Sequence, residues 1–518
     1  MILSLGFVCM RVIYLGARSE TSAAALQSAR VLTVSEGRGN IYDRNLVPLV
    51  NKSDTRKAIV FPEIADVAAL KAVLSDGDFA EAMKNYSPKI IDTGGGIISG
   101  NGIYNFTVPL RYSEDQIAPH IIGYLRDGEG ISGIERSFND FLKNGAQSVS
   151  ARYFTDGVGS LMKGESIEVS VPEDENLSGV VLTIDSRIQK VAETVLKEKI
   201  SRGAAVVLDA DSGEILAAAS VPAFSPTDLA SALDSKDSPF INRAFSSYTV
   251  GSTWKLLIAA AALESGISTA RTYDCEHTIT VEDIDFHCHW EYGHGVIDMP
   301  AALRVSCNPY FIDLGLSVGA DKILETAKNL GFASSFELAP DLYTSAGKLP
   351  EREELYSKAA LASFSFGQGK LMATPLHIAV LASAFANGGF VVTPTLVSGT
   401  YDKNGNYLPY TSYQKNRVVS EETAAKIREM MISVVEDGSG ALAKPNVGSA
   451  GGKTASSQTG QFDPDGNEIV HAWFIGFYPA ENPEYAIAVF AEGMESGGDF
   501  AAPVFKDICD GIYELNCD

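Results

Sequence analysis

The sequence predicts an α+β fold in which an antiparallel sheet is built from two distant parts of the chain. Residues 203–223 contain two short apolar runs around Asp209-Ala-Asp-Ser-Gly213, a pattern typical of a β-hairpin. Residues 468–479 and 485–491 have the composition of two further adjacent strands, and a long helix-rich block, 226–435, separates the two pairs. The sheet must therefore close between non-adjacent segments, with helices flanking it.

The length of 518 residues is too great for one ordinary domain, and the character of the sequence changes near residue 178. A β-rich run over 180–184 is followed by an amphipathic helical pattern over 186–200, where a second domain is expected to begin. We predict one domain over 17–178, with a helix over Ile64–Leu74, and a second over 179–518.

The chain is acidic, with 41 Lys and Arg against 65 Asp and Glu and a net charge of −24. This charge would repel phosphates, so nucleic acid is not expected as a partner. The same charge argues against a broad electrostatic contact with an anionic membrane surface.

The first residues, 1–16, are apolar, but Arg11 interrupts them and a spanning helix needs roughly 20 apolar residues. Three interpretations compete: a membrane anchor that lacks its first residues, the core of a signal peptide, and a buried apolar segment. We favour the truncated anchor.

Ser252 and Lys255 form the first candidate catalytic pair, at the start of an apolar helical segment that ends near Gly266. Residues three apart share a helix face, so the serine hydroxyl and the lysine amine can meet. A serine needs a base to act as a nucleophile, and a lysine can serve only if its pKa is depressed. The pattern S-x-x-K alone is common in long proteins.

Two further elements make the pair specific. Ser306-Cys-Asn308 supplies S-x-N, and Lys453-Thr454 supplies the first two residues of a K-T-G strand. The order S-x-x-K, S-x-N, K-T-G is the signature of penicillin-binding proteins and serine β-lactamases.

The sequence resembles class B penicillin-binding proteins, which are membrane-anchored peptidoglycan transpeptidases. This resemblance implies a C-terminal penicillin-binding, serine β-lactamase-like transpeptidase domain, preceded by an elongated N-terminal pedestal, or dimerisation, domain. Beyond the three catalytic motifs, the segments that carry the resemblance are Gly37–Asn45, Gly133–Glu135, Ile184–Gln189, Asp211–Leu216, Gly367–Gly369, Thr374–Leu376 and Ala386–Gly388.

The resemblance also implies roles for the motif residues. Ser252 would attack the D-Ala-D-Ala end of a stem peptide, and Lys255 would take the hydroxyl proton. Ser306 would relay a proton to the leaving amine, and Asn308 would hold the peptide amide.

The third motif would bind the carboxylate of the substrate. Lys453 would tune Ser306 and attract the carboxylate, and Thr454 and Ser456 would bind it. The backbone N–H groups of Ser252 and Ser456 would form the oxyanion hole.

The third motif departs from the family pattern at Ala455, where the family has glycine, and the Val250 position usually holds proline. Glycine in such a strand allows close approach of substrate or backbone, so we expect the Ala455 methyl to shift or slow the site.

A cysteine- and histidine-rich segment predicts a structural zinc site of Cys275, Cys288, His294 and Cys307. Some class B proteins of the elongation and sporulation type carry zinc at positions that match these four. Three alternatives remain open: a Cys275–Cys288 disulfide, free thiols without a metal, and a site that uses other nearby ligands. The other candidate ligands are His277, His287, His289, Asp274, Asp283 and Asp285.

The place of Cys307 links this site to the catalytic motifs. It lies between Ser306 and Asn308, and its side chain should point away from both neighbours. A metal bound behind the motif would fix the wall that presents Ser306 and Asn308.

The resemblance predicts a peptidoglycan D,D-transpeptidase at the bacterial cell membrane, with its catalytic domain on the extracellular face. Its partners would be stem peptides, β-lactam antibiotics and a multi-pass glycan polymerase of the shape, elongation, division and sporulation family. The polymerase is expected because about 180 residues before the catalytic domain are too few for a glycosyltransferase. Two alternatives are an inactive penicillin-binding scaffold, suggested by Ala455, and a β-lactam sensor or β-lactamase.

Overall fold

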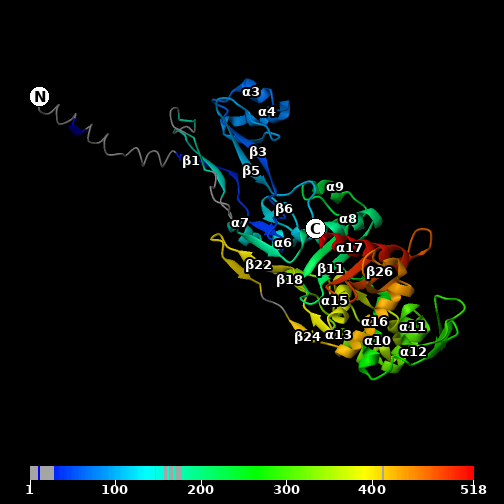
Figure 1. Cartoon of the computed structure of the whole chain (residues 1–518). Helices are drawn as coiled ribbons and strands as arrows, with labels where there is room; N and C mark the ends of the chain where they lie inside the picture. The colour runs from blue at the N-terminus through cyan, green and yellow to red at the C-terminus, as the bar shows by residue number, and fades with distance from the viewer. Residues whose placement is uncertain are drawn as a thin grey trace, which may run out of the picture.

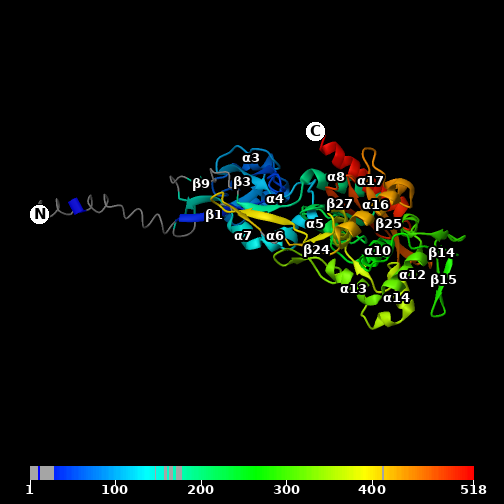
Figure 2. The ribbon, with the colours of Figure 1, turned by 60° about the horizontal axis from the view of Figure 1, so that its bottom comes forward.

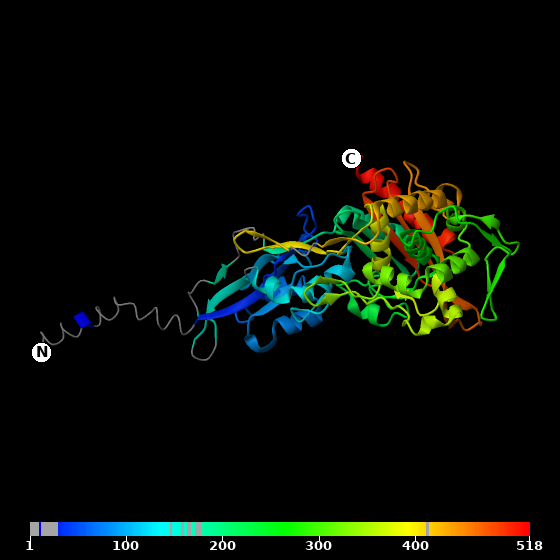
Figure 3. The same cartoon turned by 90° about the horizontal axis from the view of Figure 1, so that it is seen from below.

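The computed structural model describes residues 10–11, 29–145, 148–156, 160–162, 167–170, 178–410 and 414–517. The molecule is elongated, with the N-terminal part at one end and the C-terminal domain at the other (Figure 1, Figure 3). The predicted apolar segment lies almost entirely outside the described residues. Within the described ranges, no helix has both the length and the apolar character needed to span a membrane.

The core of the C-terminal domain is an antiparallel sheet with the strand order β12-β11-β27-β26-β25. β11 (Gly203–Asp209) and β12 (Ile215–Val221) form the predicted hairpin, and β11 lies beside β27 (Tyr485–Ala491). β26 (Glu468–Tyr478) and β25 (Gly451–Phe462) complete the sheet. The expected closure between distant segments is therefore confirmed.

Helices cover both faces of this sheet (Figure 1). On one face lie α8 (Ser186–Lys199) and α17 (Ala502–Leu515), which bury their apolar stripes against it. On the other lie α10 (Lys255–Glu264), α15 (Pro375–Ala386) and α16 (Glu421–Asp437). α10 is apolar on nearly every side and is enclosed by the domain, as expected of a central helix.

The cysteine- and histidine-rich segment forms two small hairpins. They pair β14 (Tyr273–Cys275) with β17 (Gly295–Ile297), and β15 (Thr278–Val281) with β16 (Ile284–His287). Both hairpins lie at the end of the domain farthest from the N-terminal part (Figure 2). The other elements of the domain are α9 (Leu229–Leu233), α11 (Met299–Arg304), α12 (Asn308–Val318), α13 (Ala320–Asn329), α14 (Lys358–Ser365), β13 (Tyr248–Thr249) with β20 (Met372–Ala373), β18 (Glu337–Ala339) with β19 (Leu342–Tyr343), and β21 (Phe390–Val392) with β24 (Lys415–Arg417).

The N-terminal part contains two three-stranded sheets and several short helices. The helix expected over Ile64–Leu74 is shorter, because the Asp66 side chain accepts from the N–H groups of Ala68 and Ala69 and starts α3 after it. The elements are β1 (Ala29–Ser35), β8 (Val149–Phe154) and β9 (Glu168–Ser170); β3 (Ser53–Val60), β4 (Lys89–Asp92) and β5 (Ile103–Leu110); β6 (Leu125–Arg126) and β7 (Glu129–Gly130); and α3 (Val67–Lys71), α4 (Asp76–Ala82), α5 (Pro119–Ile122), α6 (Gly133–Ser137) and α7 (Asn139–Asn144).

A mixed sheet joins the two parts of the chain. β2 (Asn40–Tyr42) runs parallel to β10 (Gly179–Leu182), which pairs on its other side with β22 (Val397–Tyr401) and through it with β23 (Tyr407–Pro409). Because this sheet crosses the predicted boundary, the division at residue 178 stays a prediction.

Glu135 holds the base of the N-terminal part together. Its buried carboxylate accepts from Arg38 at 2.7 Å, from Arg111 at 2.6 Å and from the Tyr112 hydroxyl at 3.0 Å. A buried carboxylate with two arginine partners is fully compensated, so Glu135 has a structural role in this part of the chain.

Candidate active site

The predicted nucleophile lies where β13 leads into the central helix. Gly251–Trp254 is a 3₁₀ turn, and α10 begins at Lys255. Side chains three residues apart eclipse in a 3₁₀ turn, so Ser252 and Lys255 lie on the same side of it. This short tight segment presents the half-buried Ser252 at the N-terminus of a buried helix.

A contact between two glycines fixes the backbone just before Ser252. Gly251 has a φ of 68°, and its N–H donates to the carbonyl of Gly367 at 3.0 Å. A Cβ atom on Gly367 would lie 1.9 Å from the Gly251 carbonyl oxygen. The Gly367–Gly369 segment was singled out only by resemblance, and the structure supplies its physical reason: no other residue allows this approach.

Lys255 connects the nucleophile turn to the S-x-N motif. Its side chain is fully buried, and its ammonium donates to the Ser306 carbonyl at 2.7 Å, to Ser306 Oγ at 3.2 Å and to Asn308 Oδ1 at 2.7 Å. Burial lowers the pKa of Lys255 to about 8, although Cys307 and Cys288 nearby act to raise it. The lysine therefore has a depressed pKa, as the base of such a pair requires.

Helical spacing predicted a direct contact between Ser252 Oγ and Lys255 Nζ. The hydrogen bonds of the ammonium instead go to Ser306 and Asn308, and the Ser252 hydroxyl has no hydrogen-bond partner among the described residues. The ammonium has three N–H donors, and the Ser306 carbonyl, Ser306 Oγ and Asn308 Oδ1 together account for all three. Lys255 and Ser252 thus lie on the same side of the turn, but no hydrogen bond joins their side chains in this structure.

The Ser306–Asn308 segment is held in an unusual conformation. Ser306 has a φ of 57°, in the left-handed region that a residue with a side chain seldom occupies. Asn308 is oriented at both ends of its amide, because Oδ1 accepts from Lys255 and Nδ2 donates to the His287 carbonyl at 3.2 Å. Cys307 between them is fully buried, and its Sγ lies among the other predicted metal ligands.

Lys453 is the second buried lysine of the site. It donates to the carbonyl of Thr454 at 2.9 Å and to Thr454 Oγ1 at 3.3 Å, rather than to Ser306. Burial, and then the charge of Lys255, lowers the pKa of Lys453 well below its ordinary value. The predicted tuning of Ser306 by Lys453 therefore has no direct hydrogen bond in this structure.

Ala455 faces the interior of the domain. It lies opposite Trp473 in the sheet, is 3% exposed, and belongs to the buried cluster that includes Trp254 and Trp473. The Trp473 side chain is fully buried, and its ring N–H donates to the Thr249 carbonyl at 2.9 Å. The extra methyl group therefore lies on the buried side of the strand, whereas the neighbouring Ser456 is exposed.

The four predicted metal ligands come together. One ligand atom each from Cys275, Cys288, His294 and Cys307 lies within 4.8 Å of all the others, and the three cysteines are free thiols. His294 Nδ1 is 3.7 Å from Cys275 Sγ and 3.4 Å from Cys288 Sγ. Tetrahedral zinc with Zn–S bonds of about 2.3 Å separates its ligands by roughly 3.8 Å, so this donor set fits a metal ion.

Backbone pairing explains how these ligands meet. Cys275 lies opposite Gly295 in the β14–β17 hairpin, which brings it beside His294. A Cβ atom on Gly293 would lie 2.1 Å from the Cys275 carbonyl oxygen, so only glycine fits there. One hydrogen bond between Cys288 and Cys307 lowers the pKa of Cys288 and raises that of Cys307, so the two thiols share a proton at this point of the cluster.

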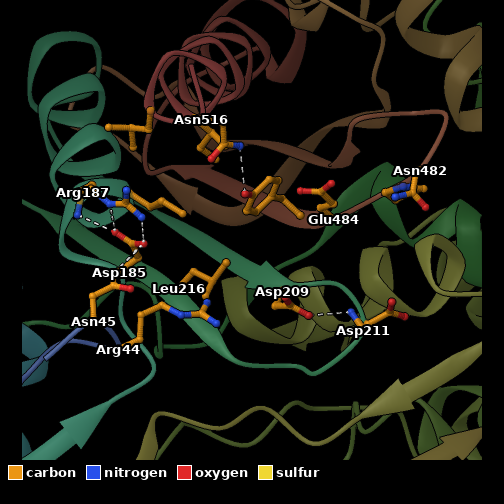
Figure 4. A pocket seen from close by; sticks show the side chains of 15 residues that line it. Arg44, Asn45, Asp185, Arg187, Asp209, Asp211, Leu216, Asn482, Glu484 and Asn516 are labelled. Carbon is orange, nitrogen blue, oxygen red and sulfur yellow. Dashed lines mark hydrogen bonds and ion pairs between the residues drawn. The ribbon is translucent and has the colours of Figure 1, made fainter. Parts of the chain in front are cut away.

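A separate polar cavity of about 430 Å³ lies where the N-terminal part meets the C-terminal domain (Figure 4). Arg44 and Arg187 line one side of it, and Asp209 and Glu484 line another. Both arginines are paired, Arg187 with Asp185 at 2.7 Å and Arg44 with Glu214 at 3.0 Å. None of the predicted catalytic or metal-binding residues lines this cavity.

Two contacts of the site come from residues that sequence reasoning did not single out. Ser439 Oγ lies 3.1 Å from Thr454 Oγ1, and the N–H of Gly497 donates to Ser456 Oγ at 3.3 Å. For the contact of Ser439, the sequence Gly438-Ser439-Gly440 after α16 predicts a turn. It does not predict that this turn lies beside the Lys453-Thr454 strand, because no spacing rule relates the two segments.

The fold and the motif geometry agree with the comparisons to known proteins. Residues 203–510 match the family described as the penicillin binding protein transpeptidase domain. Stage V sporulation protein D of Bacillus subtilis (strain 168) is 29% identical over 537 residues, which cover 96% of this chain and 81% of that protein. Peptidoglycan D,D-transpeptidase PbpA of Mycolicibacterium smegmatis is 30% identical over 426 residues, which cover 76% of this chain and 82% of that protein.

Solved structures show the same fold. Penicillin-binding protein PBP2 of Helicobacter pylori, in complex with MreC, has a TM-score of 0.71 at 22% identity and covers 95% of this chain and 99% of its own. The ceftriaxone acyl-enzyme of penicillin-binding protein A from M. tuberculosis has a TM-score of 0.68 at 23% identity, over 92% and 98% of the two chains. The chain belongs to the class B penicillin-binding protein transpeptidases.

Proposed function

We propose that this protein is a serine-type D,D-transpeptidase that cross-links peptidoglycan stem peptides through an acyl-enzyme on Ser252. One observation carries the proposal. A fully buried Lys255 with a depressed pKa lies one 3₁₀ turn from Ser252 and binds both Ser306 and Asn308. Buried titratable groups with shifted pKa values, converging from separate segments, are typical of catalytic sites.

In the proposed acylation step, Ser252 Oγ attacks the carbonyl carbon of the penultimate D-alanine. The hydroxyl proton passes to the neutral amine of Lys255. The peptide C–N bond then breaks, Ser306 delivers a proton to the departing amine and takes one back from the Lys255 ammonium, and the terminal D-alanine leaves. The N–H groups of Ser252 and Ser456 stabilise the negative oxygen of the tetrahedral intermediate.

Deacylation completes the cross-link. The amine of a second stem peptide attacks the ester on Ser252, loses a proton and forms a new amide bond. Ser252 recovers its hydroxyl proton. Throughout, Asn308 orients the bound peptide, and Lys453, Thr454 and Ser456 hold its carboxylate.

Cys275, Cys288, His294 and Cys307 would bind Zn²⁺ as a structural ion. When bound, the metal supplies a cross-link between the β14–β17 hairpin and the start of α12, with no open position for substrate. Cys307 is the residue through which this cross-link reaches Ser306 and Asn308, so it positions them from behind.

The scaffold alternative depended on Ala455, whose methyl group is buried beneath the strand rather than exposed beside Ser456. This burial favours an active enzyme. In that role, the protein would act at the bacterial cell membrane with its catalytic domain outside, bind β-lactams, and work with a multi-pass glycan polymerase.

Covalent labelling with a fluorescent penicillin tests the proposal. The native protein should be labelled stably, and Ser252→Ala should abolish labelling. Ser265→Ala is a matched control, because Ser265 lies at the other end of the same helix and donates to the Ala261 carbonyl at 2.7 Å. Labelling that survives in Ser252→Ala would refute the assignment, and rapid turnover of the drug would favour a β-lactamase instead.

A further inference from the structure

The proposed carboxylate subsite contains a hydroxyl group that none of the three catalytic motifs supplies. Ser439 is exposed in the turn after α16, and its Oγ lies 3.1 Å from Oγ1 of Thr454. Thr454 is expected to bind the substrate carboxylate. Ser439 therefore lies beside the proposed carboxylate position, although it belongs to a different segment of the chain.

The turn that carries Ser439 is fixed on both sides. The N–H of Ser439 donates to the Arg304 carbonyl at 3.0 Å, and the N–H of Gly440 donates to the Val434 carbonyl at 3.0 Å. A Cβ atom on Gly438 would lie 2.7 Å from Arg304 Cγ and 2.8 Å from the Arg304 carbonyl oxygen. The turn therefore packs tightly on the end of α11, two residues before Ser306, and these contacts hold the backbone of Ser439 beside Thr454.

The hydrogen bonds of the neighbouring hydroxyls show what Ser439 can do. Thr454 Oγ1 accepts from Lys453 at 3.3 Å, and Ser456 Oγ accepts from the Gly497 N–H at 3.3 Å. Each of these hydroxyls has one proton left to donate to a carboxylate. If Thr454 donates its proton to the substrate, it no longer donates to Ser439, and the single hydroxyl proton of Ser439 can point to Thr454 Oγ1 or, after rotation of the hydroxyl, to the carboxylate.

The charges around the subsite favour a site rich in hydroxyl donors. Lys453 is fully buried, and burial lowers its pKa well below its ordinary value, so a smaller share of it is charged and it attracts an anion less than an ordinary lysine does. The nearby Arg304 is paired with Asp437 at 3.5 Å, and both side chains are exposed, where charge interactions are weak. Neutral hydroxyl donors that are already in position would supplement these two charges.

We propose that Ser439 is a third hydroxyl donor to the substrate carboxylate, beside Thr454 and Ser456. The inference rests on the proposed function, and it names the ligand group as the C-terminal carboxylate of a D-alanyl peptide or the ring carboxylate of a penicillin. Ser439 is then a substrate-binding residue, which contributes to affinity and acylation without taking part in proton transfer.

The test compares acylation of Ser439→Ala, Ser439→Thr and native protein by benzylpenicillin and by its methyl ester. Loss of one hydrogen bond to a charged group should lower the second-order acylation rate constant of Ser439→Ala for the acid about tenfold, and that for the ester less than about twofold. Ser439→Thr should retain the native rate constants. Ser433→Ala is the matched control, because Ser433 lies on the preceding helix and donates to the Met430 carbonyl at 2.7 Å.

Two outcomes would overturn the proposal. Ser439→Ala could match Ser433→Ala with both compounds, or it could lose the same factor with acid and ester, which would indicate general distortion of the site. Equal melting temperatures of the variants would show that folding is preserved.

A second measurement separates this proposal from the proposed function. In a Ser252→Ala background, NMR titration compares a peptide ending in D-Ala-D-Ala with its C-terminal amide. Adding Ser439→Ala should weaken binding of the acid about tenfold and leave the amide unchanged. An equal effect on both peptides would refute the role of Ser439, whereas penicillin labelling that persists in Ser252→Ala would refute the proposed function alone.

Discussion

The rate of acylation by penicillin should rise with pH as Lys255 loses its proton. Its side chain is fully buried, and burial lowers its pKa from 10.5 to about 8. If the neutral amine is the base, the competent fraction is roughly 1% at pH 6, roughly 10% at pH 7 and roughly 90% at pH 9. Acylation should therefore accelerate about tenfold per pH unit below pH 7 and approach a plateau near pH 9.

Stopped-flow labelling with a fluorescent penicillin at constant ionic strength measures this profile. Lys255→Arg is the control, because an arginine stays charged and its residual rate should not follow pH. Lys453→Arg should move the midpoint below pH 8, since a permanent positive charge near Lys255 disfavours its protonated form. A flat profile between pH 6 and pH 8 would refute the assignment of the base.

The same pKa shift predicts how stability depends on pH. The pKa of Lys255 is lower in the folded protein than in the unfolded chain, so the unfolded chain binds more protons between about pH 8 and pH 10.5. The free energy of unfolding should rise with pH in that window, by up to roughly 3 kcal/mol relative to Lys255→Met. Chemical denaturation of both proteins across this range measures the difference, and parallel curves would contradict it.

Three further predictions concern the groups around the nucleophile. Gly367→Ala should slow acylation at least about 100-fold, because its methyl group would collide with the Gly251 carbonyl. The control Gly266→Ala should acylate normally, because Gly266 has a similar φ but open space around it, and equal rates in the two variants would contradict the prediction. Because the Ala455 methyl group is buried, Ala455→Gly should lower the free energy of unfolding by about 1 kcal/mol and change the acylation rate less than about threefold. A large gain in the acylation rate would show that the methyl group obstructs the site. A zinc chelator should lower the melting temperature and slow acylation together, and a protein that loses metal without either change would have no structural site.

Part of the fold could be predicted because the signals are local. The hairpin around Asp209–Gly213 and the strand pair over 468–491 follow from apolar runs separated by turn residues, and both are present in the sheet. The start of α3 was predicted too early, because apolar spacing does not reveal that the Asp66 side chain caps the helix. Periodicity identifies an element more reliably than its ends.

The sequence by itself determined the order of the three catalytic motifs and the spacing of the four cysteine and histidine ligands. These follow from covalent order, which the fold cannot change. The tertiary structure decided that Lys255 binds Ser306 and Asn308 rather than Ser252, because its acceptors come from a segment brought beside α10 by packing. It also decided that the Ala455 methyl faces the core and that Ser439 adjoins Thr454. Strand register determines the direction of the Ala455 methyl, and the packing of a distant turn determines the position of Ser439. Local sequence spacing predicts neither of these features.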